Sequence, residues 1–186
     1  NSDEVFSKIE KVKTLNSGIL GSELCGKIRP GHFDGVLTVV NKIFELIRPD
    51  VAIFGAKDYQ QQILIKKMAQ SLHPKITLIK APIVRSKNGI ALSSRNNYLS
   101  KKEFDLASNL YICLENSVRS YKNSIDLKEI LDNAKSFLIS KNLMPDYFEL
   151  RDSELNYISK NNFSGSKVFL SSVTINNTRL IDNIEF

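Results

Sequence analysis

The feature that most constrains the fold is an alternation of helical and strand patterns early in the chain. Apolar residues recur at helical spacing over residues 33–47, and this pattern ends before Pro49, because proline disfavours a helical residue ahead of it. A short apolar run at 50–54, a second helical pattern at 58–72 and another apolar run at 76–79 follow. Such alternation with short connections is typical of a parallel sheet covered by helices, and it predicts an α/β fold. By its pattern, the run at 50–54 is predicted to be a fully buried strand.

Composition excludes several other classes of protein. The 186 residues are 42% hydrophobic and 25% charged, as in ordinary globular domains. No apolar stretch approaches the roughly 20 residues that cross a bilayer, and the acidic first residues do not form a signal peptide. The net charge of +6 lacks the basic runs of nucleic-acid-binding surfaces, and a modest positive field suits a small anionic substrate. Cys25 and Cys113 form no CxxC pair, which predicts a reduced cytoplasmic protein without a zinc site.

The second half of the chain carries two further helical patterns. Apolar stripes run over residues 104–121 and 127–138. Ser100 and Glu103 have the spacing of a capping box, so a helix is predicted to begin directly after Ser100.

Strand patterns complete a second, smaller unit. Three strands are predicted, at residues 146–150, 167–175 and 178–183. Asn176-Asn177 is predicted to be a hairpin turn between the last two. These helices and strands are therefore predicted to form a compact α+β unit with an antiparallel sheet.

A polar cluster lies where the first predicted strand meets the second helix. Ligands of parallel sheets bind beyond the carboxyl ends of the strands, and the first turn of a helix offers free N–H groups to an anion. Gly55 permits a sharp turn, and Lys57 adds a positive charge for phosphate. Asp58 can accept hydrogen bonds from sugar hydroxyls, and Gln61 offers a donor and an acceptor to a polar substrate. Helix capping by Asp58 beside exposed glutamines is the alternative, and the pattern alone leaves both open.

Two other clusters also combine charged and polar groups. Ser93, Ser94 and Arg95 follow a turn at residues 87–89 and lie on a predicted loop between the two units. The arginine fork matches phosphate oxygens and the hydroxyls add neutral donors, so this is either a mobile phosphate-binding loop or an ordinary polar linker. Arg29 and His32 precede the first helix and can either contact a ligand or serve a structural role.

Three stretches together resemble the pantothenate synthetase (pantoate–β-alanine ligase) family. They are RPGHFDGVLTVVNKIFELIRPDVAIFGAKDYQQ, ALSSRNNYLS and RLIDN, at residues 29–61, 91–100 and 179–183. The resemblance is dense over residues 24–100. It implies a cytoplasmic enzyme of the pathway to coenzyme A. In such an enzyme, residues 1–83 are implied to be the C-terminal part of a Rossmann-like domain that binds ATP and pantoate, and residues 84–186 a small α+β lid domain. Such an enzyme joins (R)-pantoate to β-alanine through a pantoyl-adenylate, uses ATP with Mg²⁺, and releases pyrophosphate and AMP.

The resemblance also implies a set of site residues. The residues implied to line the ATP site are Gly55, Ala56, Lys57, Asp58, Val84, Leu92, Ser93, Ser94 and Arg95. Among these, the residues implied to take part in catalysis are Lys57, Ser93, Ser94 and Arg95. Val84 is implied to contact the adenine region, and residues 92–95 to form the counterpart of the KMSKS loop of related adenylating enzymes. Gln61 is implied to bind pantoate, and no metal ligand is implied among the protein side chains.

The sequence departs from the family pattern at several places. Cys25 stands where the family commonly has an acid, and Ala56 stands where it commonly has glutamate. The HIGH-type segment is not matched, since neither His32 nor His73 lies in such a motif. The chain is therefore expected to be the C-terminal two-thirds of a homodimeric enzyme, inactive and poorly soluble by itself. The alternatives are another nucleotidyltransferase of the same superfamily and a non-catalytic binding or interaction module.

Overall fold

The computed structural model describes residues 14–158 and 164–186. Contacts between residues divide this part of the chain into two units. The first consists of residues 14–52 and 64–79, and the second of residues 53–63 and 80–186. Residues 53–63, which carry the first polar cluster, thus pack with the C-terminal half of the chain. The boundary at residue 83 between a nucleotide-binding domain and a lid domain stays a prediction.

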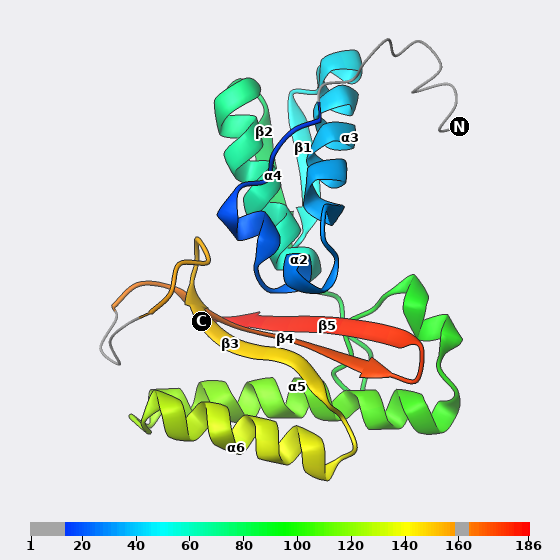
Figure 1. Ribbon diagram of the computed structural model, residues 1–186, viewed down its shortest axis with the longest axis vertical. Helices are drawn as coiled ribbons and strands as arrows, with labels where there is room; N and C mark the ends of the chain where they lie inside the picture. Colours follow the sequence, from blue (N-terminus) through cyan, green and yellow to red (C-terminus); the bar gives the residue numbers. More distant parts are fainter. Residues whose placement is uncertain (1–13, 159–163) are drawn as a thin grey trace. The chain divides into compact units, whose positions relative to one another are not determined.

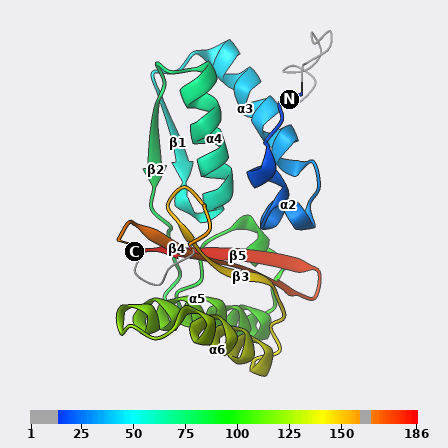
Figure 2. The same cartoon turned by 60° about the vertical axis from the view of Figure 1, so that its left-hand side comes forward.

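Parallel strands and their flanking helices form the α/β part. Strands β1 (Val51–Gly55) and β2 (Thr77–Ala81) are neighbours in a two-stranded parallel sheet. Helices α3 (His32–Ile47) and α4 (Tyr59–Leu72) lie on the same side of the two strands (Figure 2). The predicted helix, strand, helix and strand are therefore confirmed, and with them the α/β class.

The prediction that residues 50–54 form a fully buried strand is wrong. In the described part of the chain, helices cover one side of the two strands, and apolar side chains on the other side are exposed. Val51 is 48% exposed, Ile53 65% and Ile79 46%. Ala52 and Phe54, which alternate with them along β1, are half-buried. An apolar run alone does not reveal how many faces of a sheet are covered.

The second unit is built on a three-stranded antiparallel sheet. Its strands are β3 (Pro145–Asp152), β4 (Lys167–Ile175) and β5 (Thr178–Glu185), in the order β3-β4-β5. The pair Ile175 and Thr178 closes the hairpin between β4 and β5. Figure 1 shows helices α5 (Lys101–Lys122) and α6 (Leu127–Ser140) together on one face of this sheet. The predicted small α+β unit is confirmed.

Helix capping and a continuous core stabilise the second unit. Ser100 and Glu103 form the predicted capping box, in which each side chain accepts a hydrogen bond from the backbone N–H of the other residue. The ring of Phe169 is fully buried against Phe148 and Phe186. Burial raises the pKa of the Cys113 thiol to about 12, so this cysteine behaves as a small apolar core residue.

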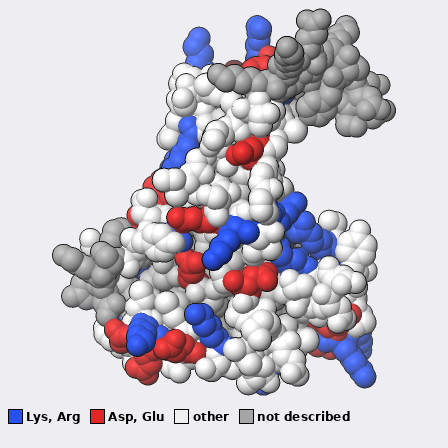
Figure 3. All heavy atoms as spheres, in the orientation of Figure 1, with Lys and Arg blue, Asp and Glu red and all other residues white. Residues whose placement is uncertain are grey.

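The described surface carries charges of both signs. On the face that Figure 3 shows, basic and acidic side chains are interspersed, and no large area carries basic side chains alone. In the described part of the chain, no helix combines the length and the apolar character needed to cross a membrane. Cys25 and Cys113 are both buried and free of disulfide bonds.

Candidate functional site

A single 3₁₀ turn connects the end of β1 to the start of α4. The turn, η2 (Ala56–Asp58), follows Gly55 and carries Lys57 half-buried and Asp58 exposed. Of the described residues, none forms a hydrogen bond or ion pair with the Lys57 ammonium or the Asp58 carboxylate. The capping role considered for Asp58 is thus not seen. Gln61 follows one helical turn later, half-buried on α4.

The Lys57 ammonium lies in an environment suited to an anion. Partial burial lowers the pKa of Lys57, and the nearby Arg95 guanidinium acts in the same direction. Asp58 and Asp182 raise this pKa in turn, by smaller contributions than burial. An ammonium that has lost part of its hydration, has no direct partner and lies near a second cation gains much by binding a phosphate.

Strand β5 holds the backbone of this turn. The side-chain amide of Asn183 donates hydrogen bonds from Nδ2 to the carbonyl oxygens of Ala56 and Lys57, both at 3.0 Å. Asn183 is only 4% exposed, so water competes weakly with these two bonds. The position of Lys57 is therefore fixed by a strand that lies more than 100 residues later in the chain.

The neighbouring Asp182 forms a buried ion pair with Arg85. Arg85 Nη1 donates to Asp182 Oδ2 at 2.6 Å, and Arg85 Nη2 donates to Oδ1 at 2.9 Å. Burial raises the pKa of Asp182, and the bidentate contact with Arg85 opposes this rise. The Arg85 guanidinium also lies over the ring of Tyr111, with its carbon 4.1 Å from the ring centroid. Both charges are thus paired in a site that excludes most water.

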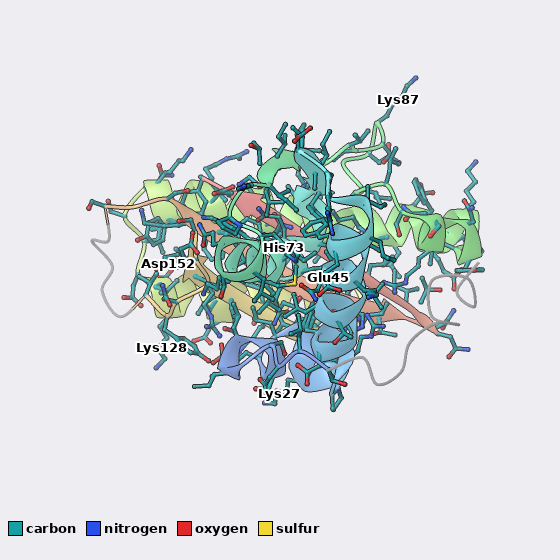
Figure 4. All side chains as sticks on the ribbon, turned by 90° about the horizontal axis from the view of Figure 1, so that it is seen from above. Lys27, Glu45, His73, Lys87, Lys128 and Asp152 are labelled. Atoms are coloured by element: carbon teal, nitrogen blue, oxygen red, sulfur yellow. The ribbon has the colours of Figure 1, made fainter. Side chains whose placement is uncertain are left out.

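Arg85 belongs to a short hairpin that leads into the second polar cluster. The Leu92 N–H donates to the Val84 carbonyl at 2.9 Å, and Arg85 bridges Ala91. Val84 and Leu92, at the base of this hairpin, are more than half exposed. The hairpin reverses direction in the predicted turn, where Lys87 projects away from the ribbon (Figure 4).

The cluster of Ser93, Ser94 and Arg95 was predicted to lie on a loop, and this is wrong in detail. Residues Ser94–Tyr98 form a 3₁₀ helix, η3, and the Ser93 hydroxyl caps it by accepting a hydrogen bond from the Arg95 N–H at 3.2 Å. Serine competes for backbone N–H groups in this way at helix starts, which a loop prediction overlooks. Ser94 and Arg95 are exposed, and Ser93 is half-buried.

Half of the predicted site residues lie in two 3₁₀ segments that contact one strand. Strand β5 contacts both η2 and η3. Lys57 and Arg95 are near enough for the arginine charge to influence the lysine. The sequence prediction missed Arg85, Asp182 and Asn183 as residues of this region, although RLIDN contributed to the resemblance. The sequence does carry a signal for two of them, because Asp182 and Asn183 are an acid and an amide inside an otherwise apolar strand pattern.

The two side chains of the third cluster contact each other in the first unit. Arg29 Nη1 and His32 Nε2 are 2.7 Å apart and hydrogen-bonded, at the start of α3. This bond is what the structural alternative expects, and a contact of either residue with a ligand stays a prediction. Within residues 14–158 and 164–186, no three histidine, cysteine, aspartate or glutamate side chains converge to hold a metal ion.

Comparison with known proteins gives a consistent family. The model of the pantoate-beta-alanine ligase family matches residues 1–185. Pantothenate synthetase from Acinetobacter baylyi is 37% identical over 183 residues, which are 98% of this chain and 64% of that protein. The Shewanella woodyi enzyme of the same name is 39% identical over 168 residues, which are 90% of this chain and 59% of that protein. The chain thus spans less than two thirds of these relatives.

Solved structures agree with the sequence comparison. The crystal structure of pantothenate synthetase from Thermus thermophilus matches with a TM-score of 0.87 and 30% identity, covering 99% of this chain and 67% of that one. Pantoate-beta-alanine ligase from Francisella tularensis, solved in complex with beta-gamma ATP and beta-alanine, matches with a TM-score of 0.73 and 26% identity. That match covers 98% of this chain and 61% of the Francisella chain.

Proposed function

This chain belongs to the pantoate-β-alanine ligase family, and we propose that the complete protein joins pantoate to β-alanine at the expense of ATP. The relatives named pantothenate synthetase and the ATP-analogue and β-alanine complex of the Francisella ligase support these substrates. The activity is proposed for the complete protein because the chain covers 64% of its Acinetobacter relative.

Two successive displacements account for the proposed reaction. A carboxylate oxygen of pantoate attacks the α-phosphorus of ATP, forms pantoyl-adenylate, and expels pyrophosphate with the electron pair of the broken P–O bond. The amine of β-alanine then attacks the acyl carbon, loses a proton, and expels AMP. The first step needs alignment and neutralisation of phosphate charge more than a protein nucleophile.

One observation carries the proposal: the half-buried Lys57 ammonium has no direct partner among the described residues and lies within electrostatic reach of Arg95. Two cations on segments that both contact β5, one of them at the end of a parallel strand, suit a polyphosphate. We assign Lys57 and Arg95 to the phosphates, with Ser93 and Ser94 as neutral donors. The exposed Val84 and Leu92 offer an apolar contact for adenine.

The remaining roles follow from position and chemistry. Gly55, Ala56 and Asp58 complete the ATP side of the η2 turn, and Gln61, on the first turn of α4, is assigned to pantoate. Mg²⁺ neutralises triphosphate charge and is held in such sites mainly by phosphate oxygens and water.

The proposal is tested by pyrophosphate release from the full-length protein. ATP and pantoate together are expected to release pyrophosphate, and β-alanine is then expected to yield pantothenate. Lys57→Ala and Arg95→Ala should each slow the first step about 10²- to 10³-fold, as the loss of one oxyanion donor does elsewhere. Lys87→Ala, which removes an exposed lysine of the hairpin, is the matched control. Release without any dependence on pantoate would assign the chain to another nucleotidyltransferase, and no release would contradict the proposed function.

A further inference from the structure

The η2 turn that carries Lys57 is held from outside its own helix. The residue directly before it, Gly55, supplies no side-chain cap. The two side-chain hydrogen bonds to the carbonyls of Ala56 and Lys57 both come from the single amide of Asn183. A carbonyl pair held by one rigid planar donor leaves the turn little freedom to rotate. The direction of the Lys57 side chain therefore depends on where Asn183 lies.

Asp182 fixes Asn183 in turn. Asp182 Oδ1 accepts a hydrogen bond from the Asn183 backbone N–H at 2.7 Å, and the Asn183 carbonyl accepts one from Arg85 Nη2 at 3.1 Å. Asp182 and Asn183 are both 4% exposed. Arg85 thus bonds both the side chain of Asp182 and the backbone carbonyl of Asn183.

Arg85 connects the same pair to the second phosphate-binding segment. Its Nη1 donates to the Gly89 carbonyl at 2.9 Å, across the hairpin that ends at Leu92. Ser93, Ser94 and Arg95 follow directly, and β5 contacts their 3₁₀ helix. Lys57 and Arg95 come from segments far apart in the chain. The turn of Lys57 is bonded to Asn183, and the hairpin that precedes Arg95 is bonded through Arg85 to Asp182 and to the Asn183 carbonyl.

We infer that Asn183, held by Asp182 and Arg85, is a positioning residue that orients Lys57 toward the phosphates and fixes its position relative to Arg95. This inference rests on the proposed function, because the relative position of the two cations matters only if both bind one polyphosphate. Asn183 acts through the backbone of Lys57, because its side-chain amide donates to the carbonyls of Ala56 and Lys57. Misplacing a charge by about 1 Å is enough to slow such a reaction about 100-fold.

A double-mutant cycle in the full-length protein tests the inference. Asn183→Ala is combined with Lys57→Ala, and pyrophosphate release and the dissociation constant of ATP are measured for all four proteins. Asn183→Ala alone should lower kcat for pyrophosphate release about 100-fold and leave the KM for pantoate unchanged. In the Lys57→Ala background it should change the rate by less than about twofold, because its effect passes through Lys57. Asn177→Ala, in the exposed β4–β5 turn, is the matched control.

The outcomes separate the inference from the proposed function. A wild-type rate in Asn183→Ala, or an equal loss in both backgrounds, would overturn the positioning role and leave the function intact. If the wild-type protein releases no pyrophosphate, the proposed function fails. The dissociation constants of ATP for the same four proteins then decide whether Asn183 acts through Lys57. Thermal unfolding is recorded for every variant. If Asn183→Ala does not fold, the cycle is run with Asn183→Ser, which keeps one donor and should lose less activity.

Discussion

Among single residues, Lys57 combines an expected function with a cost in stability. Because burial lowers its pKa, the unfolded chain holds this proton more tightly than the folded protein does. At pH values between the lowered pKa and the ordinary value of 10.5, the unfolded chain therefore binds more protons at Lys57 than the folded protein does. As pH rises through this range, the free-energy cost of burying the Lys57 charge decreases and the folded protein becomes more stable.

Lys57→Met should therefore stabilise the full-length protein at pH 7, and the gain should shrink as pH approaches 10.5. Urea unfolding at a series of pH values measures this difference, with Lys87→Met as the control at an exposed lysine. A variant less stable than the wild type at pH 7 would show that Lys57 is not penalised by burial. This residue is a candidate for a site maintained at the expense of stability.

Gln61 provides a test of substrate choice at the same scale. Its amide is assigned to pantoate, so Gln61→Ala should raise the KM for pantoate and leave the dissociation constant of ATP unchanged, because a site built to pair polar groups discriminates through them. Gln70→Ala, on the exposed side of the same helix, is the control. Weaker ATP binding with an unaltered pantoate KM would reassign Gln61 to the nucleotide.

At the scale of elements, the hairpin between Val84 and Leu92 depends on Gly89. Gly89 has a φ of +84°, and a Cβ at this position would lie 2.1 Å from Cδ1 of Tyr111. Since the Tyr111 ring packs on Arg85, a shift of the ring would also disturb the Arg85–Asp182 pair.

Gly89→Ala should therefore destabilise the protein by more than about 1 kcal/mol and should also weaken ATP binding. Gly35→Ala is the contrasting variant, because Gly35 lies in α3 with open space where its Cβ would be. Calorimetric unfolding and ATP titration of both variants distinguish a local strain from a general effect of added volume. Equal stability of the two variants would contradict the role given to Gly89.

The periodicity of apolar residues in the sequence predicted the helices and strands better than it predicted the contacts of the candidate site. Strand β4 coincides with the predicted residues 167–175, and α3 begins one residue before the predicted helix. Asn183 could not be predicted as a partner of the η2 turn, because its contacts join residues 126 or 127 positions apart, which no local pattern encodes. Burial of the strand at 50–54 was misjudged for the same reason, since coverage is decided by distant segments.

For the whole molecule, the division into units follows contacts and not sequence order. The chain leaves the first unit at residue 52, contributes residues 53–63 to the second, and returns at residue 64. The predicted ATP-site residues from Gly55 to Asp58 therefore belong to the same unit as Val84, Arg95 and β5. The geometry expected to matter for phosphate binding thus lies within one unit.

The exposed side of β1 and β2 should govern the behaviour of the 186-residue polypeptide. In the described part of the chain these two strands pair only with each other, and Val51, Ile53 and Ile79 expose apolar side chains on one side. Unpaired edges beside an apolar surface recruit other chains, so residues 1–186 produced alone should self-associate.

Combining Ile53→Thr with Ile79→Thr should reduce light scattering without lowering the unfolding temperature, because threonine keeps the β-branched shape that strands favour. Ile139→Thr, at a half-exposed position of α6, should leave the scattering unchanged. A monodisperse wild-type polypeptide, or equal effects of the sheet and helix substitutions, would show that this surface does not drive association.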